Sequence, residues 1–286
     1  MTEHLIVGAG KFSHAHLRVL NELSVKHVEL LKNSPWQHTQ IKEFETKHSA
    51  MHIDFFSNET HCIDCDFYKD KIVHIVTPSV THLAILDQAR SAERIFVEKP
   101  SVLYESSADF VLAKNIADSK SLIYHNDWFA GIQDLRTQKT CPDQIRFNYD
   151  VANNDTVDLI AEIASHCVIF LCHWFEPDVE IQIQQLNIAH NFAEISLILD
   201  NRTRIDITVS SGRVAASAWQ CQITNGINTE HFDSVEIKGS LLINTLSAML
   251  TNSATRTNWY KASWMIHRFR MLDQSAEFYH QFEKFY

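Results

Sequence analysis

Two segments of the sequence place proton-transfer groups where ligands commonly bind. Lys99 follows the β-branched run 94–97, so we expect it at the end of a strand, with its backbone held by Pro100. Glu162 and His166 are four residues apart in a segment of helical periodicity, which puts them on one face. The rest of that helix is apolar, and a polar stripe on a buried helix needs partners or a cavity, such as a cleft between two domains. We interpret His166 as a general acid/base oriented by Glu162; a buried His–Glu pair in the core is the alternative.

A glycine-containing turn near the amino terminus has the features of a phosphate cradle. The segment Gly8-Ala9-Gly10-Lys11-Phe12-Ser13 directly follows an apolar run and opens a helical segment. Gly8 permits the tight turn, Gly10 lets a pyrophosphate approach the backbone, and Ser13 is small enough for close helix–strand packing. The free N–H groups at the start of the helix favour the phosphates. The pattern in this context predicts a dinucleotide site, and a purely structural strand–helix turn is the alternative.

The end of the second expected strand, 27–31, bears on which dinucleotide is bound. An acidic residue there accepts hydrogen bonds from the ribose diol, whereas a basic residue suits a 2′-phosphate. Lys32, Asn33 and Ser34 follow the strand, and Glu29 lies earlier, inside it. We therefore expect NADP, with NAD as the alternative if Lys32 is only a solvated surface lysine.

Strand-like and helix-like segments alternate through the first 125 residues. We expect strands at 5–8, 27–31, 51–55, 71–76, 94–97 and 121–124, and helices at 12–23, 35–48, 80–90 and 105–117. This alternation predicts an α/β domain of the Rossmann type, in which ligands bind at the carboxyl ends of parallel strands.

The pattern changes after residue 126. We expect a helix at 155–175, strands at 179–188, 192–199, 202–210, 216–223 and 232–237, and a helical, aromatic-rich segment at 258–286. Consecutive strands joined by short turns predict a largely antiparallel sheet. The predicted architecture is thus a dinucleotide-binding domain (1–125) followed by an α+β domain (126–286) for substrate binding and oligomerisation.

Three further motifs make the chain resemble the Gfo/Idh/MocA family of NAD(P)-dependent oxidoreductases. The segment Thr77-Pro78-Ser79-Val80-Thr81-His82 resembles the family's T-P-x-x-x-H, Glu98-Lys99-Pro100 matches its E-K-P, and Glu162-Ile163-Ala164-Ser165-His166 resembles its D-x-G-x-H. With the glycine motif, the resemblance covers residues 4 to 180. It implies that the first two motifs contribute to the cofactor site, and that Lys99 stands beside nicotinamide and substrate and assists proton transfer. Partial desolvation beside a cationic ring lowers the pKa of a lysine, which suits that task. The alternative for Lys99 is a surface turn.

The chain departs from the family pattern in its helix motif. Glu162 replaces the aspartate, Ala164 replaces the glycine, and Ile169 occupies a position that is acidic in the family. Loss of one carboxylate near the substrate puts the substrate class in doubt more than the fold.

These residues together predict an enzyme that transfers a hydride between nicotinamide C4 and a hydroxyl, carbonyl or imine carbon of a small molecule. A sugar-like compound or a biosynthetic intermediate is the expected substrate. The alternative from another class is a dinucleotide-binding regulator or partner-binding protein without catalysis. The altered helix motif favours that alternative, while Lys99 and His166 oppose it.

Composition narrows the classes of partner. A formal net charge of −10 over 286 residues argues against general affinity for nucleic acid or anionic membranes. The longest apolar stretch, 159–175, is too short for a membrane span, and no secretory signal pattern opens the sequence, so a cytoplasmic location is expected.

Apolar alternation at 195–199 and six aromatic residues near the end (Trp259, Trp264, Phe269, Phe278, Phe282, Phe285) suggest a homo-dimer or larger homo-oligomer. Packing of the last helix on its own sheet explains them equally well.

Cys62 and Cys65 form a C-x-x-C with His61 beside it. A zinc site needs a second ligand pair at suitable spacing, and the sequence offers no convincing one, so no metal site is expected and the thiols are interpreted as reduced.

Overall fold

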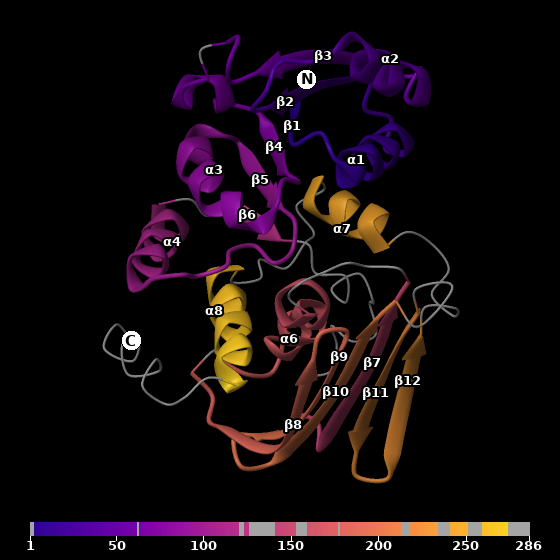
Figure 1. Ribbon diagram of the computed structural model, residues 1–286, viewed down its shortest axis with the longest axis vertical. Coiled ribbons are helices and arrows are strands. Elements are labelled where there is room, and N and C mark those ends of the chain that lie inside the picture. The colour runs from indigo at the N-terminus through magenta and orange to yellow at the C-terminus, as the bar shows by residue number, and fades with distance from the viewer. Residues whose placement is uncertain are drawn as a thin grey trace. The chain divides into compact units, whose positions relative to one another are not determined.

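Six parallel strands form the first sheet, in the order β3-β2-β1-β4-β5-β6 (Figure 1). The strands are β1 (His4–Val7), β2 (His27–Lys32), β3 (His52–Ser57), β4 (Ile72–Ile75), β5 (Arg94–Val97) and β6 (Ile123–His125). Every pair in this sheet is parallel. The intervening helices are α1 (Lys11–Glu22), α2 (His38–Lys47), α3 (His82–Gln88) and α4 (Ser107–Ser119). The predicted Rossmann-type sheet is confirmed.

The computed structural model describes residues 3–61, 63–119, 123–125, 141–152, 159–176, 178–212, 218–233, 241–250 and 259–273. They divide into two compact units. The first contains the described residues up to Val102, those from Ala108 to His125, and helix α7 (Leu241–Leu250). The second contains most of the remainder.

Apolar side chains cover both faces of the parallel sheet. On the face toward α1 and α2, Val28 and Leu30 of β2 pack with Leu17, Leu20 and Phe44. Figure 1 shows α3 and α4 on the opposite side of this sheet from α1. Burial on both faces is the physical reason for the β-branched, nearly continuous apolar strands, because each fully buried aliphatic side chain stabilises the fold by about 1.5–3 kcal/mol.

Helix α7 belongs to the first unit although it comes late in the chain. Its Leu246 is fully buried against Val19, Ile72 and Phe96. The guanidinium of Arg94 also donates a hydrogen bond to the carbonyl oxygen of Leu250, at 3.0 Å. The sequence predicted a single boundary after residue 125 and did not predict that α7 packs in the first unit.

The second sheet is mixed, in the order β12-β11-β7-β10-β9-β8. Its strands are β7 (Gln144–Val151), β8 (Ile181–Ala189), β9 (Phe192–Leu199), β10 (Thr203–Ser211), β11 (Ala218–Asn225) and β12 (Asn228–Asp233). Only β7 and β10 pair in parallel, and the other described pairs are antiparallel. The largely antiparallel second domain is therefore confirmed. Strand β7 was not predicted, although Ile145, Phe147 and Tyr149 alternate with polar residues.

One face of the second sheet is apolar and in register across neighbouring strands. Ile207 of β10 lies opposite Phe147 of β7 and Ile195 of β9. Phe147 packs edge-on against Phe170 of α6 (Ser165–Leu171), with ring centroids 5.3 Å apart. The apolar positions at 195–199 thus serve the core of this unit, and a homo-oligomer stays a prediction.

The end of the described chain is helix α8 (Trp259–Arg270), followed by a 3-10 turn (Met271–Asp273). Trp259, Trp264 and Phe269 are buried in the fold, whereas Phe278, Phe282 and Phe285 lie outside the described residues. Among the described helices, none has the length and apolar character needed to span a membrane.

Buried histidines make stability depend on pH. Burial lowers the pKa of His4 and of His267 to about 4, and it also lowers the pKa values of His74 and His82. Between about pH 4 and 6.5 the unfolded chain therefore binds protons that the native chain does not.

We expect the free energy of unfolding to fall as pH falls through this window. The slope is up to about 1.4 kcal/mol per pH unit for each such histidine. Urea unfolding at pH 7, 6 and 5 measures it, and His4→Asn should make the slope shallower. A midpoint that does not move between pH 7 and 5 would contradict the assignment of neutral buried histidines.

Candidate functional site

A cavity of about 510 Å³ opens at the carboxyl ends of β1, β2 and β4 in the first unit. Six of the residues predicted for cofactor binding line it, namely Gly8, Gly10, Lys32, Asn33, Thr77 and Pro78. They come from three separate turns, which the parallel sheet brings to one edge. The cavity therefore lies where a sheet of this topology binds ligands.

The two glycines at the cavity differ in what the fold requires of them. Gly8 has a φ of +129°, and a Cβ there would lie 3.0–3.1 Å from Val76. At Gly10 a Cβ would meet nothing within 4 Å, and the residue has an extended φ of −97°. The positive φ and the close approach of Val76 thus explain why residue 8 is a glycine. At Gly10 no such contact exists, and the absence of a side chain keeps space open beside the N-terminus of α1.

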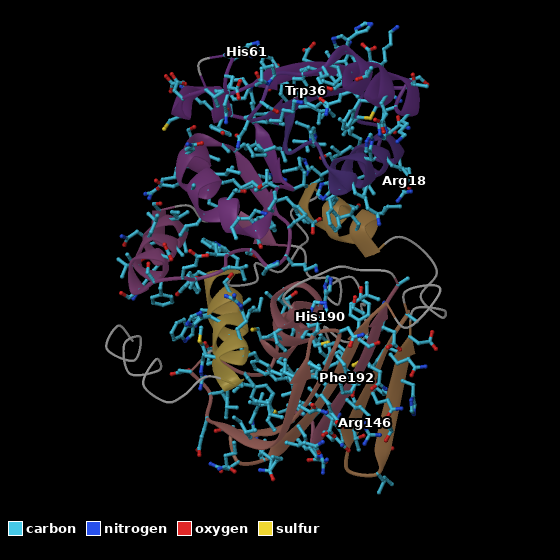
Figure 2. The ribbon with its side chains drawn as sticks, viewed as in Figure 1. Arg18, Trp36, His61, Arg146, His190 and Phe192 are labelled. Atoms are coloured by element: carbon cyan, nitrogen blue, oxygen red, sulfur yellow. The ribbon has the colours of Figure 1, made fainter. Side chains whose placement is uncertain are left out.

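The carboxyl ends of β2 and β3 bring a lysine and two amides to the cavity. The Lys32 ammonium donates a hydrogen bond to Gln40 (2.6 Å) and lies 4.5 Å from the ring centroid of Trp36, which is labelled in Figure 2. Asn58 donates to the side-chain oxygen of Asn33 at 2.6 Å. The cavity here therefore presents one cation and several hydrogen-bonding groups.

Glu29 stands apart from that turn, as the sequence indicated. Its buried carboxylate pairs with Lys71, with 2.5 Å between nitrogen and oxygen. Glu29 does not line the cavity, so it does not offer the carboxylate that a ribose diol would need.

The glutamate of the E-K-P motif is held by helix α1. Nε2 of buried His16 lies 2.8 Å from a carboxylate oxygen of Glu98, and since a carboxylate only accepts, the nitrogen donates. Nδ1 of His16 lies 3.4 Å from Nδ1 of His74, whose Nε2 lies 3.1 Å from Nδ1 of His4. Neutral imidazoles have one donor and one acceptor each, so His4 can donate to His74, and His74 to His16. The lowered pKa values of His4 and His74 agree with neutral rings at these two positions.

His82 joins the T-P turn to the E-K-P turn. Its Nε2 lies 2.8 Å from the carbonyl oxygen of Thr77, and its Nδ1 lies 3.0 Å from that of Pro100. The histidine is almost fully buried, which lowers its pKa, while the carbonyl groups oppose that shift. A neutral imidazole has a single N–H, so the ring donates to one of the two carbonyl oxygens at a time, and His82 does not line the cavity.

Lys99 is partly buried and lies two residues after the last residue of strand β5, Val97, close to the predicted strand end. The backbone N–H of the preceding Glu98 still donates to the carbonyl oxygen of Ile75, so strand pairing continues up to the motif. The Lys99–Pro100 peptide bond is cis. The lysine is thus presented from a rigid strand end.

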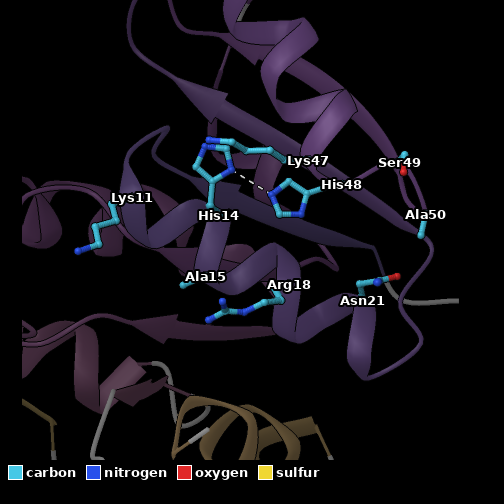
Figure 3. A pocket seen from close by; sticks show the side chains of 9 residues that line it. All are labelled: Lys11, His14, Ala15, Arg18, Asn21, Lys47, His48, Ser49 and Ala50. Atoms are coloured by element: carbon cyan, nitrogen blue, oxygen red, sulfur yellow. Dashed lines mark hydrogen bonds between the residues drawn. The ribbon is translucent and has the colours of Figure 1, made fainter.

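Four further residues predicted for cofactor binding do not line this cavity, namely Lys11, Phe12, Ser13 and Ser34. Ser13 is fully buried within α1, Phe12 is half exposed, and Ser34 is exposed. Lys11 lines a separate pocket of about 520 Å³ between α1 and the end of α2 (Figure 3). There the rings of His14 and His48 share a 3.0 Å hydrogen bond. The side chains of these four residues therefore do not contribute to the lining of the first cavity.

Several residues of the cavity were missed by sequence reasoning. They are Asn58, Tyr68, Val80, Thr81, Ala84, Ile85 and Gln88. Thr81, Ala84, Ile85 and Gln88 recur at helical spacing around α3, and that periodicity was the available signal. Asn58 follows β3, and Tyr68 ends a 3-10 helix (Cys65–Tyr68), in a connection whose course the sequence does not specify.

The helix motif of the second unit contains a π-helical turn (Ile160–Ala164) that precedes α6. A π turn pairs residues five apart, so the i,i+4 spacing of an α-helix does not hold across it. His166 is buried, and its ring centroid lies 5.9 Å from that of Tyr149 on β7. The side chain of Glu162 lies outside the described residues, and its pairing with His166 stays a prediction.

Comparison of the sequence with models of protein families and with curated proteins found no match. Solved structures match over nearly the whole chain. UDP-N-acetylglucosamine 3-dehydrogenase from Acidithiobacillus ferrooxidans is 15% identical with a TM-score of 0.72, covering 94% of this chain and 95% of that one.

Two dehydrogenases from Lactobacillus casei match similarly. The scyllo-inositol dehydrogenase, solved with NAD(H) and scyllo-inositol, is 14% identical with a TM-score of 0.70, covering 99% and 97%. The myo-inositol dehydrogenase, solved with NAD(H) and myo-inositol, is 13% identical with a TM-score of 0.69, covering 96% of each chain. At such identities the likeness shows a shared two-domain fold.

Proposed function

We propose that this chain is an NAD(P)-dependent oxidoreductase acting on a small hydroxylated molecule or on the corresponding carbonyl or imine. The observation that carries the proposal is Gly10, a glycine with no steric need inside the protein, placed where its missing side chain keeps a cavity open beside a helix N-terminus. Such a place suits a pyrophosphate, because backbone N–H groups and the helix dipole favour anions there.

The residues around the cavity fit a nicotinamide dinucleotide. When bound, that cofactor supplies hydride transfer at nicotinamide C4. Gly8 and Gly10 lie where the pyrophosphate would be held, and Lys32 and Asn33 where the adenosine ribose would be. Lys32 supports NADP as the preferred form, because an ammonium group pairs with a 2′-phosphate.

Proton transfer is assigned to Lys99, with His166 as a second acid/base group oriented by Glu162. Lys99 extends from a strand end held by the hydrogen bonds of Glu98 and His82, and a rigid support is what a catalytic group needs. The inositol and UDP-N-acetylglucosamine dehydrogenases that share the fold support cyclitols and nucleotide sugars as the first substrates to test.

A dinucleotide-binding protein without catalysis is the second candidate. Ile169, where the related motif is acidic, is fully buried and serves packing. The helix therefore lacks one polar group that substrate binding uses in the family, and this favours the second candidate.

We expect Gly10→Val to weaken dinucleotide binding by at least about tenfold without unfolding the protein. The new side chain has room in the protein but would occupy the space beside the helix N-terminus. Titration with NADPH and NADH, followed by nicotinamide fluorescence, measures binding, and circular dichroism checks the fold. Ala108→Val, at an exposed position on α4 outside the cavity lining, is the matched control for added bulk. Unchanged binding by Gly10→Val would remove the pyrophosphate site from this turn.

Lys32→Ala should weaken NADPH binding by about tenfold and leave NADH binding little changed, because only NADPH has the 2′-phosphate. The same fluorescence titrations measure both constants. Lys26→Ala, a lysine before β2 that does not line the cavity, serves as the control. Equal losses for both cofactors would show that Lys32 does not select between them.

Lys99→Met should abolish turnover and leave dinucleotide affinity within a few-fold, because it removes a proton-transfer group without changing side-chain length much. Nicotinamide absorbance during a screen of cyclitols and nucleotide sugars measures turnover. Lys114→Met on α4 is the control. Loss of binding in Lys99→Met would assign Lys99 to the cofactor site, and binding without turnover by the unaltered chain would favour the second candidate.

A further inference from the structure

A group of metal-ligand side chains lies at the amino end of β2 and β3, away from the cavity. His27 on β2 is directly opposite His52 on β3, and Asp54 follows His52 on the same face of its strand. The parallel register thus brings two imidazoles and one carboxylate together. Within the described parts of the chain, they place three donor atoms within 4.8 Å of one another.

The spacing of the donors is close to that of a coordination shell. Nε2 of His27 lies 2.9 Å from one Asp54 oxygen, and Nε2 of His52 lies 3.3 Å from the other. Two donors bound tetrahedrally to one zinc ion at about 2.0–2.2 Å are themselves about 3.3–3.6 Å apart, so the donors need to separate by only a few tenths of an ångström. Small movements of exposed side chains are therefore enough to close the site around an ion.

The site is open to solvent and independent of the cofactor cavity. The side chains of His27, His52 and Asp54 are 39%, 74% and 45% exposed, so an ion reaches them and keeps water in its remaining positions. The two rings stack with centroids 5.2 Å apart. Both Nε2 atoms lie within 3.3 Å of a carboxylate oxygen of Asp54, so an ion bound between them replaces the proton of the His27–Asp54 hydrogen bond.

We propose that His27, His52 and Asp54 form a binding site for a divalent transition-metal ion of the zinc type. Two imidazoles with one carboxylate favour such ions over magnesium and calcium, which prefer shells of oxygen. Because β3 is the edge strand of its sheet, the ion ties that edge to β2. Binding to the native chain alone raises its stability.

Calorimetric titration of the full-length chain with zinc chloride tests the site. We expect a one-to-one binding event that weakens by at least about tenfold in His27→Ala and in His52→Ala. It should persist in His190→Ala, which changes an exposed histidine in the β8–β9 turn (Figure 2), and in Cys65→Ser, which changes an exposed thiol. Circular dichroism checks that each variant is folded.

Thermal unfolding gives a second readout. Zinc should raise the midpoint of the unaltered chain and of His190→Ala, and not that of His52→Ala. Three results overturn the proposal: no zinc binding by the unaltered chain, binding retained in both His27→Ala and His52→Ala, or binding lost in Cys65→Ser. None of these measurements uses the dinucleotide, so their failure is separate from failure of the proposed function.

Discussion

The first unit depends on how a buried carboxylate is satisfied. Glu98 is nearly inaccessible to solvent, and an unpaired acid there would cost several kcal/mol. The fold therefore requires the hydrogen bond that His16 donates to this carboxylate. Because Glu98 directly follows β5 and His16 lies on α1, the helix after the glycine turn, this one contact links two segments separated by 82 positions.

The same contact orders its surroundings. His16 turns its other ring nitrogen to His74, and His74 turns its own to His4, so three histidines cross the interior with consistent donors and acceptors. His82 supports the E-K-P turn from the other side through the carbonyl group of Pro100. Lys99 thus stands on a segment whose neighbours are held by these hydrogen bonds, and such support is what the role proposed for Lys99 would require.

The second unit differs from the first because its sheet has one apolar face and one polar face. The apolar face is covered by α6, where Phe170 meets Phe147. On the polar face, Asp206 accepts hydrogen bonds from Ser196, Gln144 and Arg204, and these donors lower its pKa despite partial burial. Side chains from three strands thus join across the sheet by polar contacts.

Local pattern in the sequence determined the Rossmann-type alternation, the glycine turn, the strand-end position of Lys99 and the sheet-rich second half. These follow from hydrophobic period and turn chemistry, which act over a few residues. Only the tertiary structure decided the return of α7 to the first unit, the parallel pairing of β7 with β10, the π turn before His166 and the bond between His16 and Glu98. Each of these joins distant segments or changes a helix by one residue, and its energy comes from packing and buried hydrogen bonds that no short stretch of sequence contains. The His27–His52–Asp54 group has the same origin, because a register between two strands created it.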